Sequence, residues 1–164
     1  MTDVRRLSLL LVGLTALAVV AASTASAAPS ERTLERYLTS DTQWIALDKG
    51  RGTASFTARG AILGNLKKGS IRIVDLPRGL KTKIRVWGAD HVSRAAGRAR
   101  VYSGVNLGFR VWPGWWKLRI AGRGIAVSAA VHGTMTLVGK AGTYRIGSGR
   151  THAWPRKKRI FHLG

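Results

Sequence analysis

The stretch that decides the fold is VNLGFRVWPGWWKLRI, residues 105–120. Apolar residues occupy every second position from Val105 to Val111, and again from Trp116 to Ile120. Alternation with period two is typical of a β-strand that has one buried face and one exposed face. Pro113-Gly114 between the two runs is a turn signal. The stretch therefore predicts two strands, 105–112 and 115–121, which we expect to pair with each other as an antiparallel hairpin.

The same alternation recurs along most of the chain. It is clearest at residues 54–58, 71–73, 84–86 and 125–131, with Gly and Pro between the runs. About seven to nine short strands, joined by loops too short for crossover helices, predict an all-β protein. We expect an antiparallel sandwich or a small barrel. Residues 30–38 are the one helix-like stretch, and they predict a short leader before the strands.

The first residues follow the pattern of a secretory signal. Two arginines precede the apolar run Leu7–Ala22, and a small-residue exit follows it at Ala25-x-Ala27. The alternative is an uncleaved anchor, but this run of 16 residues falls short of the roughly 20 apolar residues that cross a bilayer as a helix. We therefore expect a secreted or extracytoplasmic protein of the cell envelope. The predicted organisation is a signal peptide at 1–27, an all-β domain at 28–149 and a basic C-terminal tail at 150–164.

The composition argues against catalysis. The 164 residues include no Cys, which excludes a disulfide framework, a thiol nucleophile and a zinc ribbon. The four His residues lack metal-ligand spacing. Asp75 and Asp90 are the one carboxylate pair that could serve a hydrolase, with His91 as a base, but both acids stand where turns are expected. We predict no enzyme, no cofactor and no metal.

The charge pattern is the strongest functional signal. Against 28 Lys and Arg stand 7 Asp and Glu, which gives a formal net charge of +21. From His91 to Gly164 there are 14 basic residues and no acidic one. A surface shaped only for solubility intersperses both signs. Arg in place of Lys can reflect genome composition, but the missing acids favour a surface that faces an anion.

Strand parity places aromatic rings among these cations. If 105–112 and 115–121 pair, their polar faces form one basic-aromatic surface, which attracts polyanions through counterion release and holds rings by cation–π contact. The predicted binding surface consists of Arg110, Trp112, Trp115, Lys117 and Arg119, with Arg85 and Trp87 beside them and the basic residues 156–159 of the tail as support.

The leading hypothesis is an exported, non-catalytic protein that binds anionic polymer or lipid headgroups on this surface. Nucleic acid would bind only as a non-specific polyanion. One alternative is a pocket for a small apolar or sugar ligand, lined by Trp116 or Trp87. Another is a purely structural envelope component, and a hydrolase ranks last.

Several strand and turn segments also resemble those of a group of secreted all-β proteins of high-GC actinobacteria. The resemblance implies export and an all-β fold, and it transfers no functional residue. The segments that carry it are GTASF at 52–56, IRIVDL at 71–76, RVWGA at 85–89, YSG at 102–104, LGFR at 107–110 and GRGIAVSA at 122–129.

Overall fold

The computed structural model describes residues 41–164, and every regular element in this range is a β-strand. The predicted signal peptide and leader lie outside the described residues. The all-β, antiparallel prediction is confirmed. Two strands are far longer than expected, because the chain bends at glycines where the sequence suggested that strands end. The strands are β1 (Gln43–Asp75), β2 (Lys83–Trp87), β3 (His91–Ala95), β4 (Ala99–Trp112), β5 (Trp115–Ile146), β6 (His152–Ala153) and β7 (Arg159–Leu163).

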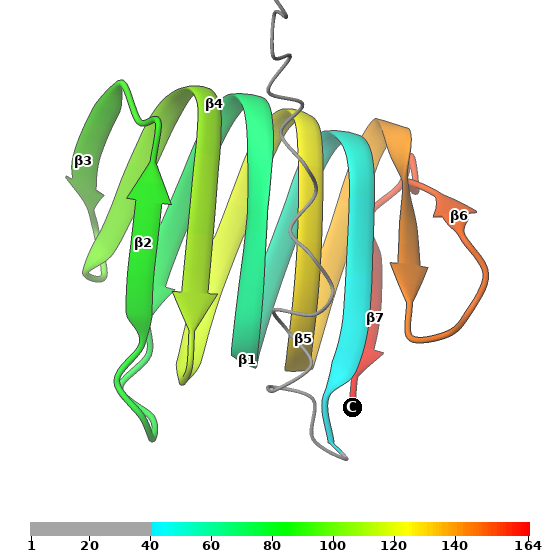
Figure 1. Cartoon of the computed structure of the whole chain (residues 1–164), viewed down its shortest axis with the longest axis horizontal. Helices are drawn as coiled ribbons and strands as arrows, with labels where there is room; N and C mark the ends of the chain where they lie inside the picture. Colours follow the sequence, from blue (N-terminus) through cyan, green and yellow to red (C-terminus); the bar gives the residue numbers. More distant parts are fainter. Residues whose placement is uncertain (1–40) are drawn as a thin grey trace, which may run out of the picture.

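The two long strands wind around each other as a flattened coil (Figure 1). β1 pairs with β5 along both of its edges, so that Ala54 lies opposite both Ile120 and Leu137, which are 17 residues apart. Val131 in turn lies opposite Gln43 and Gly60, again 17 residues apart. One turn of the coil therefore takes about 17 residues of either strand. The sheet is not closed as a barrel would be; its opposite walls face each other across the core, as the layers of a sandwich do.

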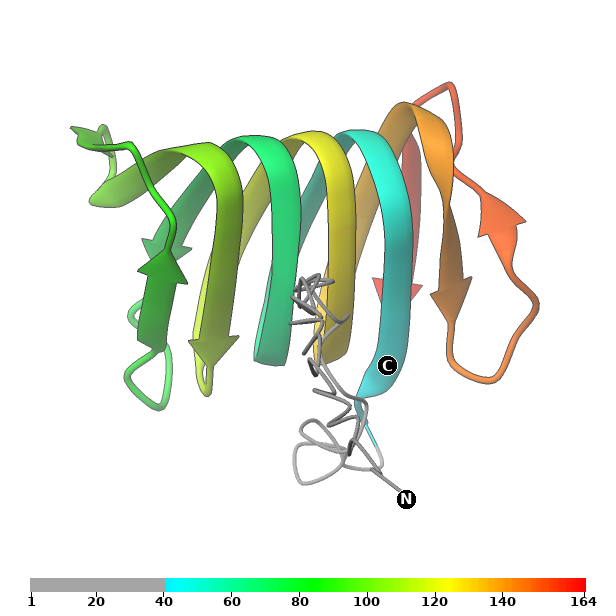
Figure 2. The same ribbon diagram turned by 45° about the horizontal axis from the view of Figure 1, so that its top comes forward.

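The order of the strands along the coil follows from this winding. β4 pairs with the second half of β1, and β2 and β3 pair with β4 at one end. β6 and β7 pair with the last part of β5 at the other end. Figure 2 shows the successive turns of β1 and β5 side by side along the long axis, so that their bends form a line.

A row of glycines makes one of these bends. Each glycine of the row lies opposite the next one on the neighbouring strand. At several of these positions an added Cβ would collide with the backbone of the neighbouring strand. A Cβ on Gly69 would lie 2.1 Å from the carbonyl oxygen of Ala121, and one on Gly122 would lie 2.2 Å from that of Lys68. Both glycines have φ above +150°, a region that other residues rarely adopt. The glycine row is Gly104, Gly69, Gly122, Gly52 and Gly139.

The bend also changes which residues face inward. Ile45 and Leu47 are buried before the bend of β1, and Ala54 and Phe56 are buried after it. The interval from Leu47 to Ala54 is an odd number of residues, so the inward parity of the strand changes between them. This change explains why the apolar alternation of the sequence breaks into short runs at glycines although the strand continues.

Apolar side chains in register fill the inside of the coil. Val111, Ile62, Ala129 and Ile45 lie in one row across four layers, and none of them is exposed. Trp116 is also fully buried, and its Nε1–H donates a hydrogen bond to the carbonyl oxygen of Gly60 at 3.3 Å. Burial of this continuous apolar surface is the main stabilising contribution to such a fold.

The C-terminal segment is part of the sheet. Trp154 is only 4% exposed, and its Nε1–H donates to the carbonyl oxygen of Thr143 at 3.0 Å. Leu163 of β7 is buried opposite Gly133. The basic tail predicted at 150–164 therefore lies at the end of the coil remote from β2 and β4, away from Arg85, Trp87, Arg110 and Trp112, which it was expected to support.

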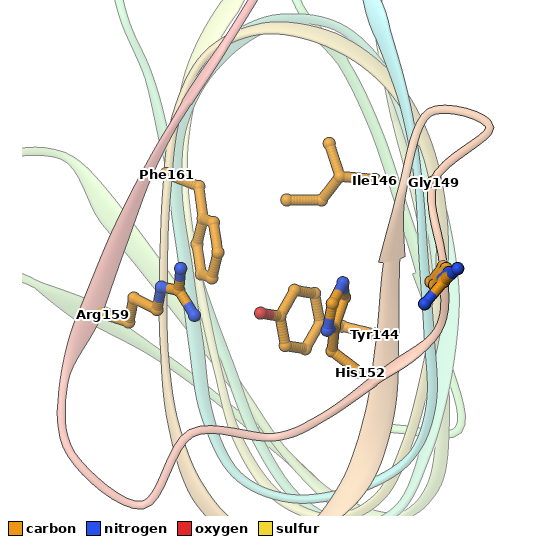
Figure 3. Close-up of a pocket in the computed structure, with 7 residues that line it drawn as sticks. Tyr144, Ile146, Gly149, His152, Arg159 and Phe161 are labelled. Carbon is orange, nitrogen blue, oxygen red and sulfur yellow. The ribbon is translucent and has the colours of Figure 1, made fainter.

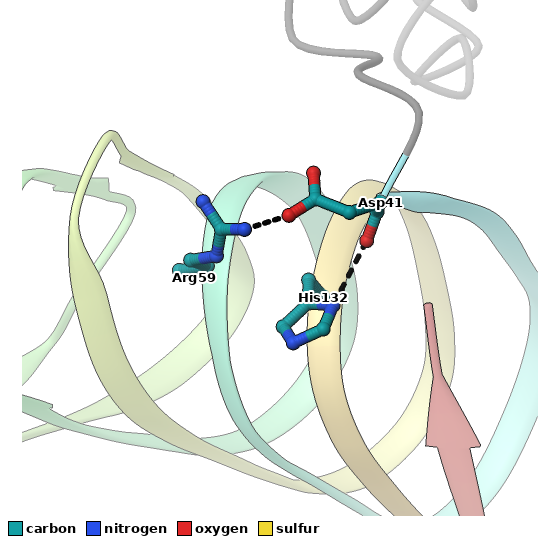
Figure 4. Close-up of polar contacts among 3 residues, drawn as sticks. All are labelled: Asp41, Arg59 and His132. Carbon is teal, nitrogen blue, oxygen red and sulfur yellow. Dashed lines mark hydrogen bonds and ion pairs between the residues drawn. The ribbon is translucent and has the colours of Figure 1, made fainter.

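A small polar cluster fixes the start of β1 (Figure 4). The guanidinium of Arg59 forms an ion pair with the carboxylate of Asp41. Nδ1 of His132 lies 2.9 Å from the backbone carbonyl oxygen of Asp41, so this nitrogen is the donor, and the His132 ring meets Trp115 edge-on. The cluster ties the first described residue to the next layers of both long strands.

The glycine row yields a stability prediction. We expect Gly122→Ala to lower the free energy of unfolding by about 3 kcal/mol, because the new Cβ must displace a neighbouring backbone carbonyl. In thermal unfolding this is a fall in Tm of roughly 10 °C. Gly79→Ala is the control, because Gly79 has φ 72° and no atom within 4 Å of the added Cβ. An equal loss in both variants would contradict a packing role for the row.

Candidate functional site

Part of the predicted basic-aromatic surface is assembled on one outer wall of the coil. Inward and outward positions alternate along β2 and along the second half of β4. Val86 of β2 and Phe109 of β4 face the core, so the residues next to each of them along its strand point outward. The register sets Lys83 opposite Trp112, Arg85 opposite Arg110 and Trp87 opposite Gly108. We call Lys83, Arg85, Trp87, Arg110 and Trp112 the β2–β4 patch.

Two arginines of the β2–β4 patch share one aromatic ring. The guanidinium carbon of Arg110 lies 4.5 Å from the ring centroid of Trp112, and that of Arg85 lies 5.8 Å from it. Like charges directly opposite each other destabilise a sheet, whereas cation–π contact compensates in part. Neither β2 nor β4 contains an acidic residue. The arrangement therefore concentrates positive charge around an indole ring without neutralising it.

The second indole of the β2–β4 patch is more open to solvent. Trp87 is 56% exposed, and its ring lies against the backbone of Gly108, where an added Cβ would come within 2.1 Å of ring atom Cε2. Because Gly108 has no side chain, the indole ring of Trp87 can pack directly against its backbone. An exposed indole beside two guanidinium groups can stack on a sugar ring or a base while the arginines bind its charged substituents.

The remaining three predicted residues lie elsewhere. β4 and β5 each pair with β1 and not with each other. Leu63, opposite Arg110, precedes the bend at Gly69, whereas Arg72, opposite Arg119, follows it. The segment of β5 that carries Trp115, Lys117 and Arg119 therefore lies on another wall of the coil than the β2–β4 patch. The predicted pairing of 105–112 with 115–121 is therefore wrong. Both strands run antiparallel to β1, so β4 and β5 wind around the coil in the same sense. At Pro113-Gly114 the chain therefore does not reverse into a hairpin. It passes the neighbouring layer formed by β1 and continues as β5.

The structure also contains an end pocket that sequence reasoning missed (Figure 3). Its volume is about 170 Å³. The rings of Tyr144 and His152 stack at 5.4 Å, and Phe161 tilts against Tyr144 at 5.1 Å. Arg159 lies over the Phe161 ring at 5.2 Å. No sequence motif marks this site, because only the pairing of β7 with β5 brings its two sides together.

Trp116 does not line the end pocket, because it is fully buried in the core. Trp87 faces outward on the β2–β4 patch. The end pocket is therefore not the predicted small-ligand pocket lined by one of these indoles.

The candidate hydrolase residues lie at the end of β1 and at the start of β3. Asp75 ends β1 opposite Trp116, whereas Asp90 precedes β3 and accepts a hydrogen bond from the backbone nitrogen of Val105 at 3.2 Å. His91 is exposed opposite Ser103. Within residues 41–164, no three His, Asp or Glu side chains are grouped so that they could hold a metal ion. The same range contains no helix that is long and apolar enough to span a membrane.

Comparison of the chain with protein families, with curated proteins and with solved structures gives no match.

The two indoles of the β2–β4 patch differ in a testable way. Trp112 packs against the small outer cluster of Ala61, Leu63 and Ala130, whereas Trp87 is mostly exposed. We expect Trp112→Ala to cost about 2 kcal/mol of unfolding free energy, and Trp87→Ala less than about 1 kcal/mol. Urea unfolding of both variants measures this difference. Equal costs would mean that Trp87 also has a mainly structural role.

Proposed function

We propose that this protein acts outside the cytoplasm as a non-catalytic binder of anionic polymer, through the β2–β4 patch. The observation that carries the proposal is the pair Arg85 and Arg110, directly opposite in register and both within cation–π distance of Trp112. Folding alone gains little from such a pair, because like charges repel. A polyanion would remove that repulsion when it binds.

The physical mechanism is delocalised Coulomb attraction combined with aromatic contact. Cations at Lys83, Arg85 and Arg110 would replace the counterions of a charged polymer, and their release drives binding at low salt. Exposed Trp87 offers a stacking surface for a ring of the bound chain. Export to the cell envelope is supported by the signal pattern of residues 1–27. Anionic lipid headgroups are the other source of the same charge.

The test is a salt series with charge-neutral variants of the β2–β4 patch. We expect Arg85→Gln/Arg110→Gln to weaken binding to an anionic polysaccharide roughly tenfold at low salt, and to reduce the slope of log K against log salt by about 2. The matched control is Arg94→Gln/Arg98→Gln, which removes the same charge from β3 and its following turn. Neutral dextran serves as the uncharged polymer.

Two results would overturn the proposal. One is binding that does not change between low and high salt. The other is an equal loss of affinity in the patch variant and the control, which would mean that net charge alone matters. Vesicles with and without phosphatidylglycerol, measured in the same series, show whether headgroups replace the polymer as the preferred anion.

The small-ligand alternative is favoured by one observation, the end pocket. Tyr144 and Phe161 offer apolar ring faces, and Arg150 and Arg159 supply positive charge at the same pocket. These groups suit a small aromatic ring that carries an anionic group. Such a ligand would raise the Tm of the wild type but not that of Arg159→Ala/Phe161→Ala.

A further inference from the structure

A second basic feature runs along the coil axis, beside the glycine row. Arg51 and Lys68 immediately precede Gly52 and Gly69, and Arg123 and Lys140 immediately follow Gly122 and Gly139. Arg123 lies directly opposite Arg51 on one side and directly opposite Lys68 on the other. All four side chains are exposed. We call Lys140, Arg51, Arg123 and Lys68 the basic row.

The stability of the fold does not explain the basic row. Cations directly opposite in a sheet repel each other, and none of the four forms a salt bridge within residues 41–164. The four acids of this range have other neighbours: Asp41 pairs with Arg59, Asp48 is opposite Thr143, Asp75 is opposite Trp116, and Asp90 accepts a hydrogen bond from Val105. Four successive layers of β1 and β5 in this range therefore each carry a cation without a salt bridge at the same bend.

A shallow groove lies at this bend. Its volume is about 380 Å³, and Arg51, Lys140 and Arg156 line it together with three members of the glycine row, Gly52, Gly122 and Gly139, and with Val138. The glycines are required by the tight backbone contacts of the bend. As a consequence, the floor of the groove is bare main chain, and a ligand can come close to it between the cationic side chains.

Contacts of the C-terminal segment hold Arg156 at the groove. The backbone nitrogen of Gly139 donates a hydrogen bond to the carbonyl oxygen of Pro155 at 2.9 Å. Trp154 is buried beneath, close enough to Gly139 that a Cβ there would lie 2.7 Å from ring atom Cε3. Arg156 follows directly after these anchored residues. The groove thus collects cations from three separate segments of the chain.

From this geometry we infer that the groove binds a linear polyanion that lies along the coil axis. The basic row repeats with the strand spacing of about 4.8 Å, so an extended chain with one phosphate or carboxylate per monomer can meet successive cations. Exposed Lys49 and Lys67 lie beside the row and add positive charge at the same bend. Guanidinium groups of Arg51, Arg123 and Arg156 match phosphate and carboxylate oxygens in bidentate geometry.

This site is separate from the β2–β4 patch. It lies on the bend of β1 and β5, whereas the patch lies on the outer wall of β2 and β4 at one end of the coil. The proposed binding at the patch and the proposed binding at the groove can therefore be tested separately, and loss of one need not affect the other. Loss of binding in Arg85→Gln/Arg110→Gln tests the patch, and the following pair of variants tests the groove.

The decisive variant is Arg51→Gln/Arg123→Gln. Its matched control is Arg72→Gln/Arg119→Gln, because these arginines are also directly opposite each other on β1 and β5 but lie away from the glycine row. We expect the groove variant to bind linear polyphosphate about tenfold more weakly at low salt, with a salt slope reduced by about 2, and the control to lose less than about twofold.

Stability distinguishes a lost binding site from a damaged fold. Removing the repulsion between Arg51 and Arg123 should leave Tm unchanged or raise it, so that affinity and stability move in different directions. Equal loss of affinity in both double variants, or none in the groove variant, would overturn the inference. Polygalacturonate at equal charge concentration shows whether carboxylates replace phosphates, and a single phosphate ion should bind far more weakly than the chain.

Discussion

The close approach of neighbouring backbones at the glycine row is the constraint on which the structure depends. β1 and β5 can pass the bend in successive layers only because no Cβ stands between a glycine and the opposing carbonyl, as at Gly69 and Gly122. The bend lets one pair of strands return to itself after about 17 residues. Each long strand thereby finds hydrogen-bond partners on both edges, and its apolar face turns toward a shared core.

The same winding sets the distribution of charge. In a sheet of independent short strands, basic residues 17 positions apart in the sequence have no fixed positions relative to each other in space. In the coil they become neighbours on adjacent layers, so Arg51 and Lys68 of one strand both face Arg123 of the other. Winding therefore turns a diffuse excess of positive charge into an ordered row. The β2–β4 patch arises differently, from ordinary antiparallel pairing of two short strands at the end of the coil.

Some of the candidate site could be predicted from residue parity alone. Arg85 and Trp87 share the outward parity of β2, and Arg110 and Trp112 share that of β4, as the alternation indicates. Parity could not show that β1 would lie between β4 and β5, because Pro113-Gly114 reads as a reversal of the chain. Nor could it reveal the end pocket, where Phe161 meets Tyr144 only through the pairing of β7.

The sequence by itself determined that the chain forms β-strands, because period-two alternation is typical of a strand with one buried face, and its short loops favoured antiparallel pairing. It also determined the large positive charge and the absence of thiol chemistry. Only the tertiary structure decided which strands are neighbours, where the alternation changes parity and which cations stand together. The physical reason is that these properties depend on the long-range register between β1 and β5, which backbone contacts at Gly52, Gly69 and Gly122 fix and no local pattern encodes.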